Sequence, residues 1–309
     1  MSICLAAVSP LIYTKKMRFL ENSLLKIGYE LPGEAYRGTR FDWGSAVVAI
    51  ELAGGHSFGS AEYTSDDARY LDGGRGLFCE FGINAPIGYD DCAPGDWFPK
   101  LGVGFLRRES GAAYDFFHTY AETREQEYEV DESSSTAVRI EARCETYRGY
   151  GWRLVRTWRL DGSALECAVR LENTGSKVLE TNEYCHNFVR LGAAPVGPDY
   201  RIGFSFPIPA AAPEAADPSS CLRGAFPEFS GEPSADFYLG GLMPSPAANP
   251  SWRLRDVRTG LSVSERLSGT GIRCALWGRS HVISPELFIR VSVRPGESQE
   301  WSRRWEFGA

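Results

Sequence analysis

The residues best suited to chemistry lie in one stretch in the middle of the chain, residues 178–191, which read VLETNEYCHNFVRL. Their β-branched and aromatic content predicts a strand. Because side chains alternate along a strand, one face is predicted to carry Glu180, Asn182, Tyr184, His186 and Phe188, and the other Leu179, Thr181, Cys185 and Val189. Burying an unpaired polar group costs about 1–3 kcal/mol. The polar face is therefore either a hydrogen-bonded structural feature or a site of chemistry.

His186 and Glu286 are the candidate catalytic pair. An imidazole titrates near neutral pH, where it can hold or release a proton. Its natural partner is a carboxylate across a cleft, and Glu286 in HVISPELFI follows a turn at the mouth of a late strand. The alternatives are a structural histidine and an ordinary acid at a strand edge. General acid–base catalysis is the chemistry that this pair indicates.

Other kinds of catalytic site find little support. The four histidines, at positions 56, 118, 186 and 281, show no HxH or HExxH spacing, so no metal site is predicted. We do not expect a serine hydrolase. No GxGxxG loop opens a helix, so a nucleotide cofactor is not expected either. Cys185 stands beside His186, but neighbouring strand residues point to opposite faces.

Further polar residues are candidates for binding a ligand. Arg40 and Asp42 crowd together just before a predicted strand, where an arginine could bind a polyol or simply form a surface ion pair. Residues 71–111 are dense in Gly, Pro and Asp but contain Phe, Tyr and Trp, which favours a functional loop over disorder. The full set of predicted substrate-binding residues is Arg40, Asp42, Glu80, Lys100, Asn182, Tyr184 and Trp277.

The elements that must position these residues are strands. Three period-two runs, near 138–145, 152–158 and 165–172, predict an antiparallel meander with a hairpin turn at Asp161–Gly162, and 178–191 is predicted to be its fourth member. Further strands are predicted at 23–30 and 47–52. After an Ala- and Pro-rich segment at 193–250, interpreted as an insertion or lid, come a hairpin turning at Thr259–Gly260 and strands near 271–278, 286–293 and 298–307. No helical repeat is found, so an all-β fold is expected.

The net charge and the cysteine content narrow the class of protein further. A net charge of -7 and a pI near 5.3 argue against nucleic acid or an anionic membrane as the main partner. The eight cysteines are scattered without a CxxC pair, which predicts a reducing, cytoplasmic setting. Residues 1–22 are interpreted as an N-terminal extension whose apolar run, SICLAAVSPLIY, is too short to span a bilayer, and 23–309 as one domain. The oligomeric state is not predicted.

Several motifs together resemble the galactose mutarotase-like (aldose 1-epimerase) superfamily. They are TNEYCHNFVRL, RPGESQEWSRRWEF, YRGTRFDWG, EFG, GYDD and KLGVGFL, and the resemblance extends from about Ser23 to the C-terminus. It implies a large antiparallel β-supersandwich in which a glutamate takes the proton of the anomeric hydroxyl and a histidine protonates the ring oxygen. His186 would be the acid. Lys100 falls near a second family histidine.

This sequence departs from the family pattern at the position of the family glutamate. Trp277 stands at about its position, so the base is either Glu286, a little downstream, or missing. Three functions remain open: an anomer-interconverting enzyme acting on a small-molecule sugar, a sugar-binding module with Trp277 as a stacking platform, or a lyase or hydrolase domain with a tyrosine base such as Tyr184.

Overall fold

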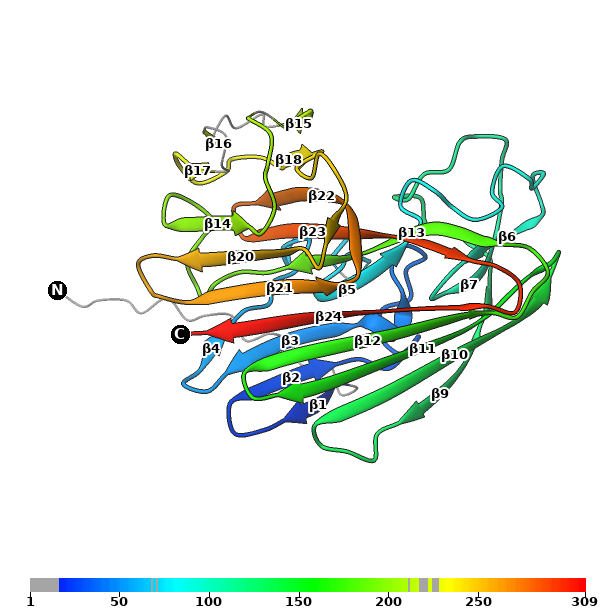
Figure 1. Cartoon of the computed structure of the whole chain (residues 1–309), viewed down its shortest axis with the longest axis horizontal. Coiled ribbons are helices and arrows are strands. Elements are labelled where there is room, and N and C mark those ends of the chain that lie inside the picture. The colour runs from blue at the N-terminus through cyan, green and yellow to red at the C-terminus, as the bar shows by residue number, and fades with distance from the viewer. Residues whose placement is uncertain (1–16, 68, 71, 211, 217–221, 224–227) are drawn as a thin grey trace.

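The computed structural model describes residues 17–309 apart from 68, 71, 211, 217–221 and 224–227. Two large antiparallel sheets pack face to face, with their long strands running roughly along the long axis of the molecule (Figure 1). Within the described residues the only helical element is one 3-10 turn, Trp43–Ser45. The expected all-β class and antiparallel supersandwich are confirmed. The first sixteen residues of the predicted N-terminal extension lie outside the described part of the chain.

The 11-stranded sheet carries the stretch at 178–191, which forms strand β13, Leu179–Phe188. Its order is β1-β2-β3-β5-β13-β23-β22-β18-β15, with β4 on β3 and β19 on β22. The other strands of this sheet are β1 (Arg18–Glu21), β2 (Leu25–Tyr29), β3 (Val47–Leu52), β4 (His56–Ser57), β5 (Gly76–Phe81), β15 (Glu214–Ala216), β18 (Phe237–Gly240), β19 (Ala247–Ala248), β22 (Thr270–Arg279) and β23 (Val282–Val293).

The 8-stranded sheet has the order β14-β20-β21-β24-β12-β11-β10-β9. Its strands are β9 (Glu127–Asp131), β10 (Ala137–Tyr147), β11 (Tyr150–Asp161), β12 (Ala164–Asn173), β14 (Tyr200–Phe204), β20 (Ser251–Asp256), β21 (Ser262–Ser268) and β24 (Ser298–Gly308). The predicted meander is present as β10, β11 and β12, and the predicted hairpin at Thr259–Gly260 joins β20 to β21.

Two smaller sheets complete the fold. One contains β6 (Trp97–Lys100), β7 (Gly104–Arg107) and β8 (Thr123–Glu125), and the other β16 (Leu222–Arg223) and β17 (Glu228–Phe229). Within the described residues no helix is long and apolar enough to cross a membrane.

The position predicted for 178–191 is wrong in one respect. Strand β13 is not a fourth member of the meander, because β24 takes the place beside β12. After Asn173 the chain crosses to the other sheet, where β13 lies between β5 and β23. Period-two patterning predicts a strand and its faces, but it does not say which strand becomes the neighbour.

The segments interpreted as a loop and an insertion are partly built into the sheets. Residues 71–111 contain β5, a central strand of the 11-stranded sheet, and also β6 and β7. Residues 193–250 supply β14 to one edge of the 8-stranded sheet and β18 and β15 to an edge of the other. Their short strands are too brief to show a clear alternating pattern, which is why the sequence predicted an irregular segment.

The core between the sheets contains charges as well as apolar side chains. Arg303 on β24 contacts Glu183 on β13 at 2.6 Å and Glu265 on β21 at 2.5 Å, and all three side chains are fully buried. Asn187 of β13 also points inward, where it binds Glu265 and accepts a hydrogen bond from the Trp305 indole. The odd-numbered residues of β13 therefore face the core, and the even-numbered ones face outward.

Candidate active site

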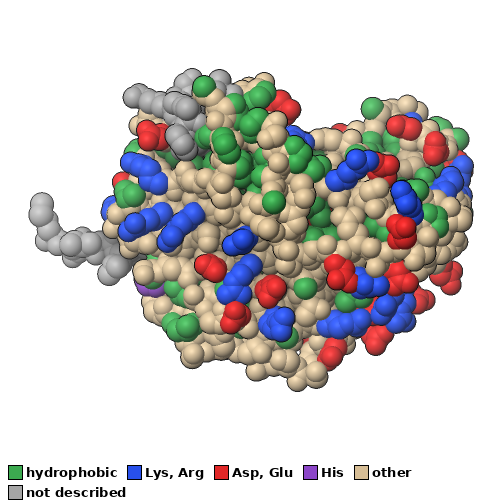
Figure 2. Space-filling model, in the orientation of Figure 1, with side chains coloured by type: hydrophobic (Ala, Val, Ile, Leu, Met, Phe, Trp, Pro, Cys, Tyr) green, Lys and Arg blue, Asp and Glu red, His purple; other side chains and the backbone are tan. Residues whose placement is uncertain are grey.

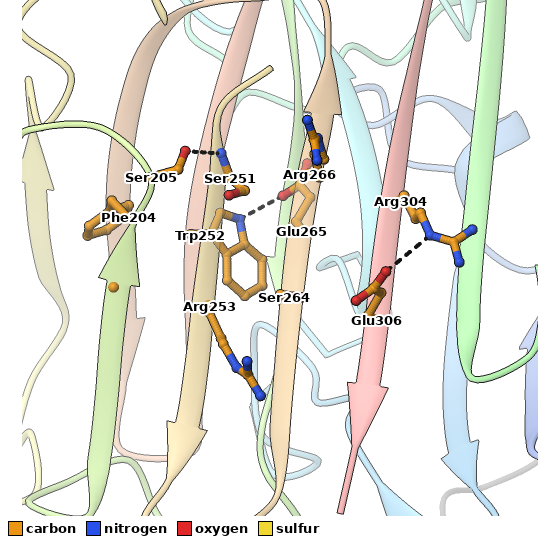
Figure 3. A pocket seen from close by; sticks show the side chains of 11 residues that line it. Phe204, Ser205, Ser251, Trp252, Arg253, Ser264, Glu265, Arg266, Arg304 and Glu306 are labelled. Atoms are coloured by element: carbon orange, nitrogen blue, oxygen red, sulfur yellow. Dashed lines mark hydrogen bonds and ion pairs between the residues drawn. The ribbon is translucent and has the colours of Figure 1, made fainter. Parts of the chain in front are cut away.

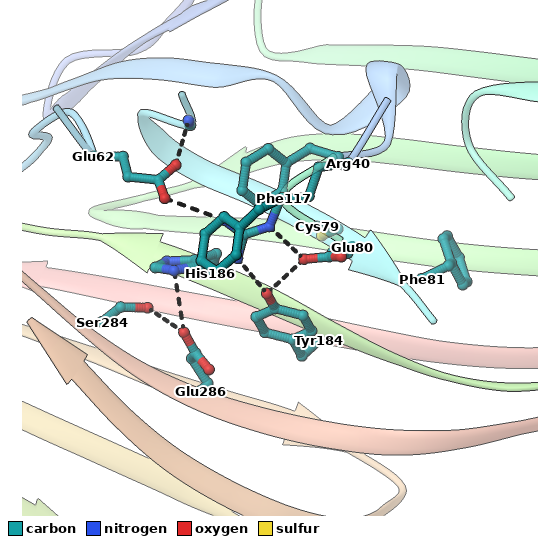
Figure 4. Close-up of polar contacts among 12 residues, drawn as sticks. Arg40, Glu62, Cys79, Glu80, Phe81, Phe117, Tyr184, His186, Ser284 and Glu286 are labelled. Atoms are coloured by element: carbon teal, nitrogen blue, oxygen red, sulfur yellow. Dashed lines mark hydrogen bonds and ion pairs between the residues drawn. The ribbon is translucent and has the colours of Figure 1, made fainter. Parts of the chain in front are cut away.

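His186 and Glu286 meet on the face of the 11-stranded sheet that points away from the other sheet. Tyr184 pairs with Phe288 across β13 and β23, and this register brings His186 opposite Glu286. The His186 Nε2 and Glu286 Oε1 atoms lie 3.4 Å apart, and both residues are only 4% exposed (Figure 4). The structure thus brings the two predicted catalytic residues into contact, although a hundred residues separate them in the chain.

Ser284 and Pro285 shape the strand next to this pair. Pro285 has no N–H and cannot complete the ladder between β23 and β13. The Asn187 backbone N–H donates instead to the Ser284 hydroxyl at 2.9 Å, and the Asn187 side chain donates to the Pro285 carbonyl at 2.6 Å. The Ser284 hydroxyl in turn donates to Glu286 Oε1 at 3.1 Å. The break in the ladder therefore supplies a hydroxyl that orients the Glu286 carboxyl group.

Burial favours the uncharged form of both groups, so it shifts their pKa values in opposite directions. It lowers the pKa of His186 well below its usual range, and the nearby Arg40 lowers it further. Burial raises the pKa of Glu286 to about 8, although Arg40 and the Ser284 hydroxyl partly oppose this. Near neutral pH, the favoured form is a neutral imidazole beside a protonated carboxyl group. The pair then holds one proton that either group can carry.

A second cluster of charges lies beside the pair, around Glu80 of β5. Arg40, from the loop before the 3-10 turn, contacts Glu80 at 2.9 Å and Glu62 at 3.1 Å, and its third nitrogen donates to the Tyr184 hydroxyl at 3.2 Å. Tyr184 donates to Glu80 at 2.7 Å (Figure 4). Burial and the nearby Glu80 raise the pKa of Tyr184 well above its usual value. Tyr184 is therefore poorly suited to act as a base.

Lys100 also belongs to this cluster and contacts Glu80. Its ammonium group lies 3.5 Å from Glu80 Oε1 and donates to the Phe81 carbonyl at 2.8 Å and to the Tyr114 hydroxyl at 3.2 Å. Only 2% of the residue is exposed, and burial lowers its pKa. Lys100 thus positions Glu80 and does not line the opening of the site.

Aromatic rings enclose the site. His186 stacks on Phe188 with ring centroids 3.9 Å apart, and Trp277 meets the imidazole edge-on at 5.1 Å. Phe117, from the loop between β7 and β8, lies above Arg40 and is 66% exposed. The cavity beside Arg40, Glu62 and Phe117 measures about 120 Å³. This is smaller than the roughly 300 Å³ at which small-molecule sites begin, and neither His186 nor Glu286 is among the residues that line it.

The other three predicted binding residues differ in where they lie. Asp42 points between the sheets, where its carboxylate pairs with Arg156 at 2.5 Å and caps the 3-10 turn, so its role is structural. Asn182 is on the same face as His186, and its buried Oδ1 has no hydrogen-bond partner among the described residues. Trp277 packs against the imidazole edge and is not a free, flat platform.

Sequence reasoning missed Glu62, Ser284 and Phe117. The SPE triplet at 284–286 offered a signal, because a proline inside an otherwise apolar strand marks a break in the ladder. Glu62 and Phe117 gave none, since each lies in an irregular loop that only the fold brings to the sheet. Among the described residues, no three His, Cys, Asp or Glu side chains come together to hold a metal.

Comparison with solved structures identifies the fold. No family model and no curated sequence matches the chain. A galactose mutarotase related enzyme from Lactobacillus acidophilus superposes with a TM-score of 0.59 at 9% identity, over 95% of this chain and 97% of that one. A galactose mutarotase-like protein from Lactobacillus casei gives 0.57 at 15% identity, over 94% and 100%. A candidate aldose 1-epimerase of Escherichia coli K12 gives 0.57 at 12% identity, over 95% and 99%.

The resemblance inferred from the sequence motifs is thus confirmed at the level of the fold. The chain forms a galactose mutarotase-like β-supersandwich. More particularly, it is one whose outer sheet face carries a buried imidazole and carboxyl group in contact.

Proposed function

We propose that the protein interconverts the anomers of a free or modified aldose by acid–base catalysis at His186 and Glu286. The observation that carries this proposal is the 3.4 Å contact between the two side chains on the outer face of the large sheet. Two titratable groups with their pKa values pushed in opposite ways by burial are typical of an acid–base site.

The chemistry requires one proton to leave and one to arrive. The anomeric hydroxyl loses a proton while the ring oxygen gains one, the bond between C1 and the ring oxygen breaks, and an open-chain aldehyde forms. The carbonyl face then turns and the ring closes again. Both reacting oxygens are attached to C1, so an acid and a base in mutual contact can serve both. With Glu286 as the base and His186 as the acid, the proton that Glu286 holds near neutral pH must first move to His186 across their 3.4 Å contact, and the reaction then balances with that one proton.

An unsatisfied atom also supports ligand binding at this point. His186 Nδ1 is buried without a hydrogen-bond partner among the described residues. Leaving such a group unpaired costs about 1–3 kcal/mol, which a sugar hydroxyl would recover. Arg40 and Glu62 lie next to the pair and can bind further hydroxyls, while the fully buried Glu80 holds Arg40 in place.

Exchange NMR on a panel of aldoses tests the proposal. The wild-type protein should accelerate anomer exchange for at least one sugar. His186→Ala and Glu286→Gln should each slow that exchange by about 100- to 10,000-fold. His56→Ala, a half-buried histidine on β4 outside the site, is the matched control and should retain full activity. A wild-type protein that binds a sugar but accelerates no exchange would be a binding module and not an epimerase.

A further inference from the structure

A second concave site lies on the opposite side of the sandwich. A groove of about 560 Å³ opens on the outer face of the 8-stranded sheet, over β14, β20, β21 and β24 (Figure 3). Its location separates it from the His186–Glu286 pair, which faces outward from the other sheet. The volume falls within the roughly 300–1,000 Å³ range of small-molecule sites.

Two rows of outward-facing residues form the floor of this groove. The strand register places Gly203, Arg253, Ser264 and Glu306 in one row across the four strands. The next row contains Ser251, Arg266 and Arg304. A Cβ atom added at Gly203 would meet nothing within 4 Å, so the space above this strand is open. Beneath the floor, the Trp252 indole binds Glu265, which keeps both polar groups directed into the core.

Arginines surround the floor with little compensating charge. Arg253 and Arg266 line the groove, and Arg201 and Arg255 form the outward-facing row next to it. All four are exposed, and none forms an ion pair with a described residue. Arg304 differs, because Asp161 and Glu306 neutralise it. Figure 2 shows blue side chains gathered over this end of the sheet. Arg201 donates hydrogen bonds to the Pro198 and Tyr200 carbonyls, and Arg253 donates to the Ser262 hydroxyl, but these acceptors carry no charge. In a chain of net charge -7, such a concentration of guanidinium groups without ion pairs favours an anionic ligand.

We propose that this groove binds an acidic oligosaccharide, a short chain of sugar rings that bear carboxylates. Guanidinium groups bind carboxylates through two parallel hydrogen bonds. Arg253 and Arg255 stand about 7 Å apart along β20, and Arg266 lies level with Ser251, about 13 Å from Arg255. Cations spread over this length match several anionic groups and not a single ion.

The remaining lining fits sugar rings better than other polyanions. The hydroxyls of Ser205, Ser251 and Ser264 can bind ring hydroxyls. Phe204 pairs with the buried Trp252 and packs against the core, so it is not a stacking surface of the groove. Single-stranded nucleic acid is bound through a series of stacked aromatic side chains, and Phe204 and Trp252 are the aromatic residues of this lining, with Trp252 buried.

Calorimetric titration with three probes tests the proposal. Trigalacturonate should bind the wild-type protein, whereas neutral galactotriose and inorganic phosphate should bind at least about tenfold more weakly. Arg253→Ala/Arg266→Ala should weaken trigalacturonate binding about tenfold or more. The matched control, Arg143→Ala/Arg159→Ala, removes two exposed arginines from β10 and β11 of the same sheet and should leave binding unchanged. His186→Ala should also leave it unchanged, which separates this site from the proposed epimerase.

A steric variant protects the test against a folding defect. Gly203→Phe fills the open space while leaving every arginine in place, and it should abolish trigalacturonate binding. The proposal is overturned if trigalacturonate does not bind, if phosphate binds equally well, or if hexaglutamate or a single-stranded oligonucleotide binds as tightly. It is also overturned if both the Arg253→Ala/Arg266→Ala and Gly203→Phe proteins fold and retain wild-type affinity.

Discussion

At the scale of single residues, the site depends on how Glu286 is held. The carboxyl group is almost fully buried beside His186, and the Ser284 hydroxyl is its neutral hydrogen-bond donor. That hydroxyl is itself fixed by the Asn187 backbone N–H. Ser284 therefore acts on the pair through Glu286, as a positioning residue.

Ser284→Ala should move the alkaline limb of the pH profile. The Ser284 hydrogen bond lowers the pKa of Glu286, so its loss raises that pKa above the present value of about 8. We expect the fall in kcat/KM at high pH to shift upward by about one pH unit. Ser284→Thr retains the hydroxyl and should restore the wild-type profile. Identical alkaline limbs for the alanine variant and the wild type would exclude the positioning role.

Glu286→Gln should change how stability depends on pH. The native pKa of about 8 exceeds the ordinary value of 4.5, so between these values the folded protein keeps a proton that the unfolded chain releases. Stability attributable to this group is present below pH 4.5 and is lost as the pH rises towards 8. When the pH is raised from 4.5 to 7.5, the free energy of unfolding of the glutamine variant should therefore increase by about 1–3 kcal/mol relative to that of the wild type. Urea unfolding at both pH values measures this, with the exposed Glu300→Gln as a control.

At the scale of elements, the turns decide which strands become partners. The hairpin between β11 and β12 closes through Gly162, whose φ of 60° lies in the left-handed region. The connection from β12 to β13, by contrast, carries the chain from one sheet to the other. The tight turn at Gly162 thus makes β11 and β12 neighbours in one sheet, whereas the longer connection after β12 ends the meander.

Gly162→Ala should destabilise the protein by about 1 kcal/mol. A Cβ at this position would meet no atom within 4 Å, so the cost comes from backbone conformation alone. Gly203→Ala is the matched control, since its Cβ also meets nothing but its φ is not positive. That variant should be neutral or slightly stabilising, as expected from a less flexible unfolded chain. Equal denaturation midpoints for the two variants would contradict this explanation.

At the scale of the whole molecule, buried charges join the two sheets. Arg303 reaches from β24 of one sheet to Glu183 on β13 of the other, directly beneath the outward-facing site. Glu265 is its second partner. A guanidinium between two carboxylates, all out of contact with water, makes the register between the sheets sensitive to a single substitution.

Arg303→Met should lower the free energy of unfolding by about 3–5 kcal/mol, because it leaves Glu183 and Glu265 buried without a counter-charge. Arg304→Met offers a matched comparison one residue away. Arg304 is half-buried on the outer face, and its surface ion pairs are worth about 0–1 kcal/mol. Guanidinium unfolding of both variants checks the difference. A cost below 1 kcal/mol for Arg303→Met would show that the buried carboxylates take up protons instead.

Several features were determined by the sequence alone. Alternation along 178–191 correctly placed Tyr184 and His186 on one face, and period-two runs predicted most long strands, because the side-chain period of a strand is a local property. Glu286 was predicted as the partner of His186 from its place after a turn at the mouth of a late strand, and the structure brings the two into contact.

The tertiary structure decided which neighbours each of these residues acquired. Asp42 stands two residues from Arg40 in the chain and Glu80 forty, yet Asp42 pairs with Arg156 between the sheets and Glu80 pairs with Arg40 at the site. Strand β13 left the predicted meander because β24, from the far end of the chain, occupies the edge of β12. Partner choice depends on contacts between distant segments, which hydrophobic periodicity does not encode, whereas the face on which a side chain lies is set by its own strand.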